Sequence, residues 1–166
     1  NGCMKTLFLI DPAFFDGHLN GARIPLCLMM LDTLRDGGRV CAQIGPRRVR
    51  VSFPSEADTI DASFSGVRLE DAPEECAFDL AVCQKGVPPE LPEGVEVTQV
   101  ALMLNDARGR QAINQFNELL SGRFGFDLFR MLGPLRAIQG NRRDRAQMAR
   151  FDRVYVQTAP EAAYLR

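Results

Sequence analysis

Residues 5–44 carry the pattern that most limits how this chain can fold. The run Lys5–Ile10 is apolar at nearly every position and stops at an Asp-Pro turn signal, which is typical of a parallel strand buried on both faces. Apolar residues then recur at helical spacing from Ile24, and two glycines follow the last turn. The run Arg39–Ile44 reads as a second strand. Together these segments predict a βαβ unit, in which a helix connects two parallel strands.

The same alternation continues along the chain. Further strands are expected near residues 78–84, 96–104 and 153–157, with short ones near 49–53 and 67–69. Residues 108–150 have a mostly helical pattern that breaks near Gly122 and near Gly133, and a capping box at Thr158 predicts one more helix. Alternating strands and helices favour a parallel sheet with helices on both faces. We therefore predict a three-layer, Rossmann-like α/β domain with a mainly parallel sheet.

Length and the start of the chain set the expected domain organisation. With 166 residues, the chain has the size of one domain. Met4 opens the first apolar run and looks like a native start, so we expect residues 1–3 to be a cloning remnant. The predicted domain then covers residues 4–166.

Charge excludes one class of protein and predicts two kinds of surface. The net charge is −1 and the pI about 5.9, whereas nucleic-acid-binding domains are usually strongly basic, so we expect no nucleic-acid partner. Residues 55–96 hold eleven acidic and two basic residues, a net charge of −9. Residues 106–153 hold ten arginines and five acids, a net charge of +5. We predict one acidic face and one basic face.

Cysteine and histidine usage argues against a metal centre. The five cysteines form no C-x-x-C pair and there is a single histidine, so a zinc site lacks ligands, and we expect neither a metal nor a cofactor. Cys27, Cys41 and Cys83 lie in apolar runs and read as small core residues. No run of about 18 apolar residues is present, and the chain does not open on a signal-peptide pattern. These features predict a cytoplasmic protein.

In a parallel sheet, ligands bind at the carboxyl ends of the strands, and the loop after the first strand is the most suggestive of these ends. Gly17 and Gly21 would let the backbone approach a ligand closely, and the following helix offers free N–H groups to an anion. Arg23 adds a forked donor suited to phosphate. The alternative is a purely structural turn, because the glycine spacing matches no dinucleotide or Walker pattern.

Polar residues at the same sheet edge are candidates for proton transfer or for binding a hydroxyl group. His18 is either an acid or base near a ligand or a solvated loop histidine. Asn105 and Asp106 follow the 96–104 strand, where they orient a hydroxyl or accept a proton, or cap the next helix. Lys85 follows the 78–84 strand.

The arginine-rich region has two readings as well. Its apolar residues at helical spacing are typical of a helical core, but the mixture of apolar and basic residues also fits an anionic membrane surface. The arginines concerned are Arg123, Arg130, Arg136, Arg142, Arg143 and Arg145.

The order of these parts resembles the N-terminal domain of GT-B-fold glycosyltransferases of the retaining group 1 class. Residues 34–40 (LRDGGRV) are similar to that class's Leu-x-x-x-Gly-x-x-Val helix end, and residues 78–82 (FDLAV) to its Tyr/Phe-Asp strand. Residues 149–158 (ARFDRVYVQT) are similar to the strand after which such enzymes cross to their second domain. One position departs from the class: where retaining members usually carry a histidine, this chain has Asn105-Asp106 after Leu104.

The resemblance implies an acceptor-side domain of an enzyme that transfers a hexose from a nucleotide sugar to a cell-surface polysaccharide or glycolipid. It implies that Gly17, Gly21 and Arg23 face the donor diphosphate, and that His18 and Asp106 form the catalytic, acceptor-lining side. Lys85 and Asn105 are then acceptor-side residues as well.

In that class the nucleotide-sugar site lies mainly in a C-terminal domain. We therefore expect this chain to be an excised half, inactive alone, from a protein at the inner face of a membrane. The alternative is a non-catalytic Rossmann-like or flavodoxin-like module that binds a ligand or a partner.

Overall fold

The computed structural model describes residues 3–21, 23–55, 57–84, 90–104, 108–122 and 127–156. The chain forms two compact units, residues 1–103 and residues 104–166. The prediction of one domain over residues 4–166 stays a prediction.

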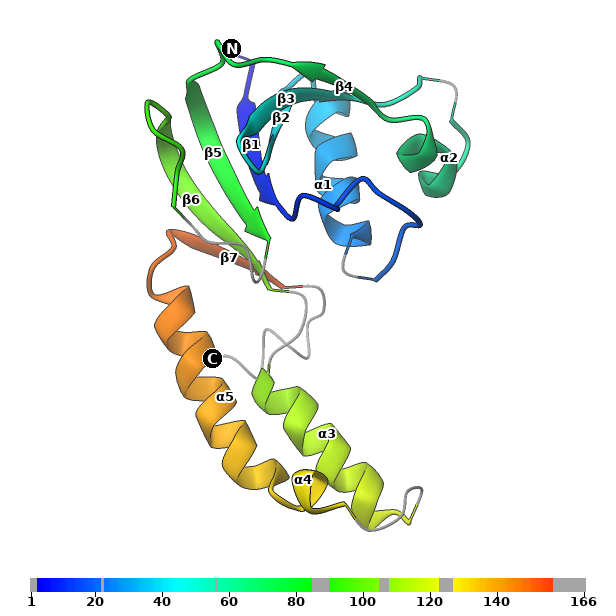
Figure 1. Ribbon diagram of the computed structural model, residues 1–166, viewed down its shortest axis with the longest axis vertical. Helices are drawn as coiled ribbons and strands as arrows, with labels where there is room; N and C mark the ends of the chain where they lie inside the picture. Colours follow the sequence, from blue (N-terminus) through cyan, green and yellow to red (C-terminus); the bar gives the residue numbers. More distant parts are fainter. Residues whose placement is uncertain are drawn as a thin grey trace. The chain divides into compact units, whose positions relative to one another are not determined.

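The first unit is built on a sheet (Figure 1). Its strands are β1 (Lys5–Ile10), β2 (Arg39–Ile44), β3 (Arg47–Ser52), β4 (Arg68–Asp71), β5 (Ala77–Gln84) and β6 (Glu96–Leu104). They lie in the order β4-β3-β2-β1-β5-β6. β1 pairs in parallel with β2 and β5, and β5 pairs in parallel with β6. The predicted α/β class with a mainly parallel, Rossmann-like sheet is confirmed.

The sheet ends in antiparallel strands that the sequence did not predict as such. β2 pairs antiparallel with β3, and β3 with β4. Only Gly45 and Pro46 separate β2 from β3, and a parallel crossover needs about a dozen residues or more. Gly45 has φ +57°, a conformation that two-residue hairpin turns require. The Gly-Pro pair therefore turns the chain directly back into a hairpin.

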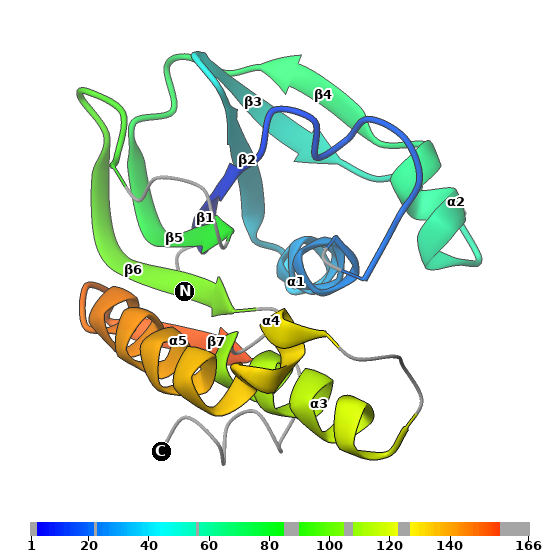
Figure 2. The same cartoon turned by 60° about the horizontal axis from the view of Figure 1, so that its bottom comes forward.

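The core of this unit lies around β1. Leu7, Phe8 and Val40 are fully buried, which fits strands that are apolar on both faces. Helix α1 (Ile24–Arg35) contacts β2 (Figure 2) and buries Leu26, Cys27 and Met30. Pro25 stands in its first turn, where its missing N–H costs nothing. The short helix α2 (Ile60–Ser65) is capped by the Thr59 side chain, which accepts a hydrogen bond from the Ala62 N–H group.

Three cysteines belong to this core, as predicted. Cys27, Cys41 and Cys83 are buried, while Cys3 and Cys76 are exposed. Burial raises the pKa of Cys27 and that of Cys83 to about 11. The reactive form of a cysteine is the thiolate, so these two thiols stay protonated and unreactive at neutral pH.

The acidic segment is partly neutralised inside the first unit. The carboxylate of Glu75, which is almost fully buried, lies 3.2 Å from Lys5 Nζ, 3.4 Å from an Arg39 guanidinium nitrogen and 3.1 Å from one of Arg50. Burial by itself raises the pKa of Glu75, but the hydrogen bonds and charges of these cations outweigh burial and hold that pKa below its ordinary value. Three strands are therefore tied to one carboxylate from the segment before β5.

The second unit is mainly helical. Its elements are α3 (Arg108–Leu120), α4 (Leu128–Met131), α5 (Gly133–Met148) and β7 (Arg153–Val156). The predicted breaks fall where expected: Gly122, with φ +72°, follows α3, and Gly133-Pro134 begins α5. The helix predicted from Thr158 lies outside the described residues. In the described ranges, no helix combines the length and the hydropathy that crossing a membrane would require.

Candidate functional site

The loop between β1 and α1 is held against the carboxyl end of the sheet by its first residue. The Asp11 N–H group donates to Gln84 Oε1 at 3.0 Å, which ties the loop to the end of β5. The Asp11 carboxylate accepts a hydrogen bond from the Ala13 N–H group at 2.8 Å. Such a turn is a common use of aspartate at the end of a strand. Asp11 therefore has a structural role here.

Aromatic packing fixes the middle of this loop. Phe14 is buried, and its ring lies edge-on to the rings of Phe15 and Phe64, with centroids 5.0 and 6.1 Å away. Edge-to-face pairs at such separations are favourable. Because Phe64 belongs to α2, a helix about fifty residues further along the chain anchors the loop.

The Arg23 side chain cross-links the loop by hydrogen bonds to its backbone. Its guanidinium donates to the carbonyl oxygens of Ala13 at 3.0 Å and of His18 at 2.9 Å, and also to that of Asp16. Gly17 has φ +80°, so a side chain at that position would be strained. The three residues predicted to hold a donor phosphate, Gly17, Gly21 and Arg23, thus lie in one loop, with the exposed His18 between them. Several Arg23 donors are already engaged by the loop itself.

A cavity of about 450 Å³ lies beside this loop, at the carboxyl ends of β1 and β2. It is lined by Leu9, Ile10, Pro12, Gln43, Gly45, Pro46, Glu90 and Pro92. We call it the carboxyl-edge cavity. This is the edge at which Rossmann-like sheets bind ligands.

Two polar side chains line the carboxyl-edge cavity, and they differ in how they are used. Gln43 Nε2 donates to the Gly45 carbonyl at 2.7 Å, and Gln43 Oε1 accepts from Arg48 Nε at 3.3 Å. The Gln43 amide is thereby held by protein groups. Glu90 is exposed and is the one charged residue among the described residues that line the cavity. Its carboxylate contributes, after burial, to the raised pKa of Cys83, which places it near the end of β5.

The chemistry of the carboxyl-edge cavity favours a hydroxyl-bearing ligand. Its walls are leucine, isoleucine and proline, which suit the apolar face of a ring, and a carboxylate accepts hydrogen bonds from hydroxyl groups. The same carboxylate repels phosphate. A phosphate would instead find the backbone N–H groups of the neighbouring loop and the start of α1.

Sequence reasoning missed Gln43 and Glu90. The residue that it identified after β5 is Lys85, which directly follows the strand, whereas Glu90 comes six residues after the strand ends. Pro92 is the sequence signal nearest to Glu90, because proline favours turns, and it lines the same cavity.

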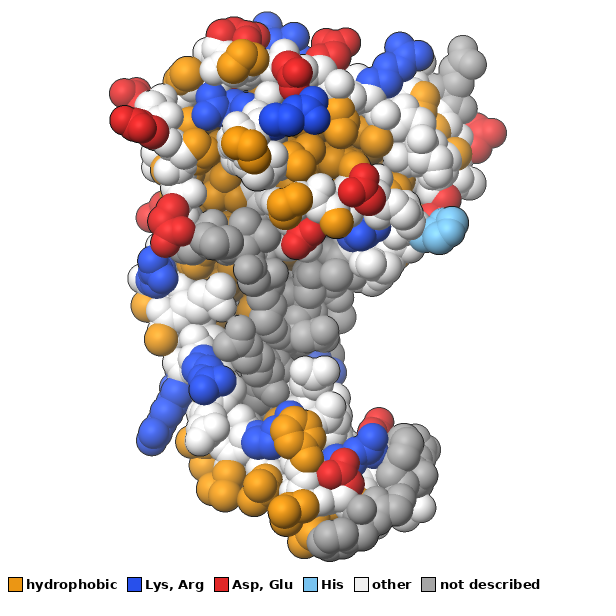
Figure 3. All heavy atoms as spheres, in the orientation of Figure 1, with side chains coloured by type: hydrophobic (Ala, Val, Ile, Leu, Met, Phe, Trp, Pro, Cys, Tyr) orange, Lys and Arg blue, Asp and Glu red, His pale blue; other side chains and the backbone are white. Residues whose placement is uncertain are grey.

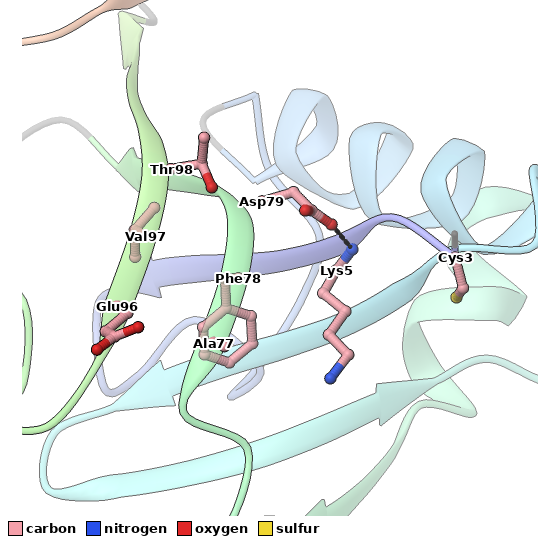
Figure 4. A pocket seen from close by; sticks show the side chains of 8 residues that line it. All are labelled: Cys3, Lys5, Ala77, Phe78, Asp79, Glu96, Val97 and Thr98. Atoms are coloured by element: carbon pink, nitrogen blue, oxygen red, sulfur yellow. Dashed lines mark hydrogen bonds between the residues drawn. The ribbon is translucent and has the colours of Figure 1, made fainter. Parts of the chain in front are cut away.

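A second cavity, of about 440 Å³, lies at the opposite, amino-terminal edge of the sheet. Figure 4 shows its lining residues from the starts of β1, β5 and β6, with Cys3 beside them. Its Asp79 carboxylate accepts a hydrogen bond from the Lys5 backbone N–H group at 2.8 Å, and Lys5 Nζ pairs with Glu75. Lys5 and Asp79 therefore serve the fold. Because parallel sheets bind ligands at their carboxyl edge, we take the carboxyl-edge cavity as the candidate site.

Three predicted site residues, Lys85, Asn105 and Asp106, lie outside the described residues. The expectation that His18 and Asp106 lie at the same edge of the sheet therefore stays a prediction. Within the described ranges, no three His, Cys, Asp or Glu side chains gather in a way that could hold a metal ion.

Comparison of the chain with protein-family models, with curated proteins and with solved structures found no match.

Proposed function

We propose that this chain is the acceptor-side domain of a glycosyltransferase that moves a hexose from a nucleotide sugar to a polysaccharide or glycolipid acceptor. The observation that carries the proposal is the carboxyl-edge cavity, which has apolar walls, one carboxylate and a place at the ligand-binding edge of a parallel sheet. A sugar has the matching chemistry, because its ring has apolar C–H faces and hydroxyl donors at its rim.

In this proposal, Glu90 accepts hydrogen bonds from acceptor hydroxyl groups while Leu9, Ile10 and the prolines pack against the ring. Gly17, Gly21 and the start of α1 face the donor diphosphate. His18, on the same loop, and Asp106 are the proposed acid and base. By the resemblance, a second α/β domain holds the nucleotide, and the protein works in the cytoplasm at the inner face of a membrane.

The acceptor role is tested by titrating the isotope-labelled 166-residue chain with methyl hexopyranosides and following backbone amide shifts by NMR. We expect weak, saturable shifts at Leu9, Ile10 and Gln43. Glu90→Gln should weaken them, because an amide oxygen is a poorer acceptor than a carboxylate. The matched control is Glu93→Gln, since Glu93 is exposed three residues away and does not line the cavity. Equal effects of the two variants, or no shifts at these residues, would contradict the acceptor role.

The donor role has a separate test. Calorimetric titration with UDP- and GDP-sugars should give at best roughly millimolar affinity, a binding free energy near −4 kcal/mol, because this unit offers one wall of the nucleotide site. No transfer should be detectable from the chain alone. Micromolar affinity would contradict a divided site.

One observation favours a second candidate, the non-catalytic binding module. Arg23 already donates to three carbonyl oxygens of its own loop, so the loop is closed without a phosphate. An NMR titration with pyrophosphate distinguishes the glycosyltransferase domain from the binding module. A glycosyltransferase domain should show shifts at Gly17 and Gly21 on adding it, whereas a binding module that uses only the carboxyl-edge cavity should not.

A further inference from the structure

Helix α4 and the first half of α5 expose large apolar side chains, although such residues usually lie inside a protein. Leu128, Phe129 and Leu135 each expose more than half of their surface. We define the α4–α5 patch as the six large apolar residues exposed on these helices and at their junction. They are Leu128, Phe129, Met131, Leu132, Leu135 and Ile138. Figure 3 shows apolar side chains gathered over this end of the helices.

The packing of α5 explains why these residues point outward. α5 buries Gly133, Ala137, Gly140 and Asp144, which recur at spacings of four, three and four and so form one stripe. Gly133 lies so close to α3 that an added Cβ would be 2.5 Å from Phe116 Cβ. The small residues thus let α5 approach α3 closely. The large apolar residues of α5 are left on the opposite side of the helix.

The same outward side becomes basic further along α5. Leu135 and Ile138 are followed at helical spacing by Arg142 and Arg145, and all four are exposed. The described residues contain no ion pair to Arg142, Arg143 or Arg145. The single acid of α5, Asp144, is buried on the α3 side. The outward side of α5 therefore carries large apolar residues over its first two turns, and the charged residues that follow on it are all basic.

We propose that the α4–α5 patch, with Arg142 and Arg145, binds the surface of an anionic lipid bilayer. Apolar side chains of this size can enter the boundary between headgroups and acyl chains, and the arginines lie where headgroup phosphates would meet them. The proposal goes beyond the sugar chemistry and uses no residue of the carboxyl-edge cavity.

Charge argues against a second copy of the chain as the occupant. If two α5 helices packed side by side in parallel, Arg142 and Arg145 would meet the same residues of the partner and repel. If they packed antiparallel, these arginines would lie over the partner's Leu135 and Ile138, and burying a charge against apolar side chains is costly. A bilayer avoids both conflicts, since its acyl chains can bury the apolar side chains while its headgroup phosphates pair with the arginines.

The experiment is co-sedimentation of the 166-residue chain with vesicles, either of phosphatidylcholine alone or of phosphatidylcholine and phosphatidylglycerol in equal amounts. We expect binding to the anionic vesicles at low salt, weaker binding at physiological salt, and none to the neutral vesicles. Each arginine near such a surface contributes about fivefold in affinity, so Arg142→Glu with Arg145→Glu should weaken binding about 25-fold or more. Leu135→Ser with Ile138→Ser should weaken it as well, at either salt concentration.

The control is a pair of substitutions of the same kind on α1 in the first unit, Leu28→Ser with Arg35→Glu. Both side chains are exposed there, so binding should be unchanged. Circular dichroism checks that each variant keeps its helices. Absence of binding at low salt, equal loss in the control, or a dimer in sedimentation velocity that Ile138→Ser dissociates would overturn the proposal. Failure of the sugar titrations leaves it intact, because the two tests use different surfaces.

Discussion

The two units handle their large apolar side chains and their charges in opposite ways. Around β1, the first unit buries Phe8, Leu7 and Ile10 completely, and it surrounds one buried carboxylate with three cations. Helices α3–α5 and the α4–α5 junction bury mostly small residues, such as Ala112, Ala137 and Gly140, and their described residues expose seven large apolar ones: Leu120 and the six of the α4–α5 patch. The first arrangement satisfies its residues internally. The second leaves apolar surface and positive charge available for a partner, which is the basis of the lipid proposal.

The largest effect that tests this comparison is expected from truncating a buried side chain in the core of the first unit. Phe8→Ala should lower the free energy of unfolding by about 4 kcal/mol, because the fully buried ring leaves a cavity. The matched control is Leu28→Ala on α1, where the side chain is exposed and the cost should be less than about 1 kcal/mol. Urea unfolding followed by circular dichroism measures both. Similar losses in the two variants would mean that the first unit does not depend on this core.

Close helix packing gives the next largest effect. Gly133→Ala should destabilise the second unit by about 2 kcal/mol, because the new Cβ would meet Phe116 Cβ at 2.5 Å and the Ala112 carbonyl oxygen at 2.8 Å. Gly21→Ala is the control, since a Cβ there meets nothing within 4 Å. Thermal unfolding of both variants measures the difference. If Gly133→Ala were neutral, small residues would not be what holds α5 to α3.

The smallest effect concerns the buried carboxylate. Glu75→Gln should cost about 1.5 kcal/mol near pH 7, because three charge-assisted contacts lose their negative partner. Since the pKa of Glu75 is lowered in the folded protein, its stabilisation is complete above the unfolded pKa of about 4.3 and is lost as pH falls through the folded value.

The difference in unfolding free energy between wild type and Glu75→Gln should therefore narrow as the solution is acidified. Urea unfolding at several pH values measures it, with Glu93→Gln as an exposed control. A difference that stays constant down to strongly acidic pH would show that the charge of Glu75 does not stabilise the sheet.

Local patterns were sufficient to predict much of the first unit. The strands 5–10 and 39–44 and the helix between them follow from apolar periodicity and from glycine and proline at the turns, which act between neighbours in the chain. The same holds for the buried cysteines, because an apolar run that becomes a central strand carries its small residues into the core. The hairpin after β2 was not predicted, because Gly45-Pro46 was not recognised as a two-residue turn.

The sequence by itself thus determined the α/β class, the approximate places of the strands in the first unit and the charge of each segment, since those depend on composition and periodicity. Only the tertiary structure decided what each charge does. In the folded protein, Arg23 donates hydrogen bonds to carbonyl oxygens of its own loop, and Glu75 pairs with cations from three strands. Glu90 lines a cavity. The tertiary structure also turned Asp144 inward and Arg142 outward. Such outcomes depend on contacts between residues that are distant in the chain and on which side of a helix packs against its neighbour. Neither can be deduced from the residues adjacent in the sequence.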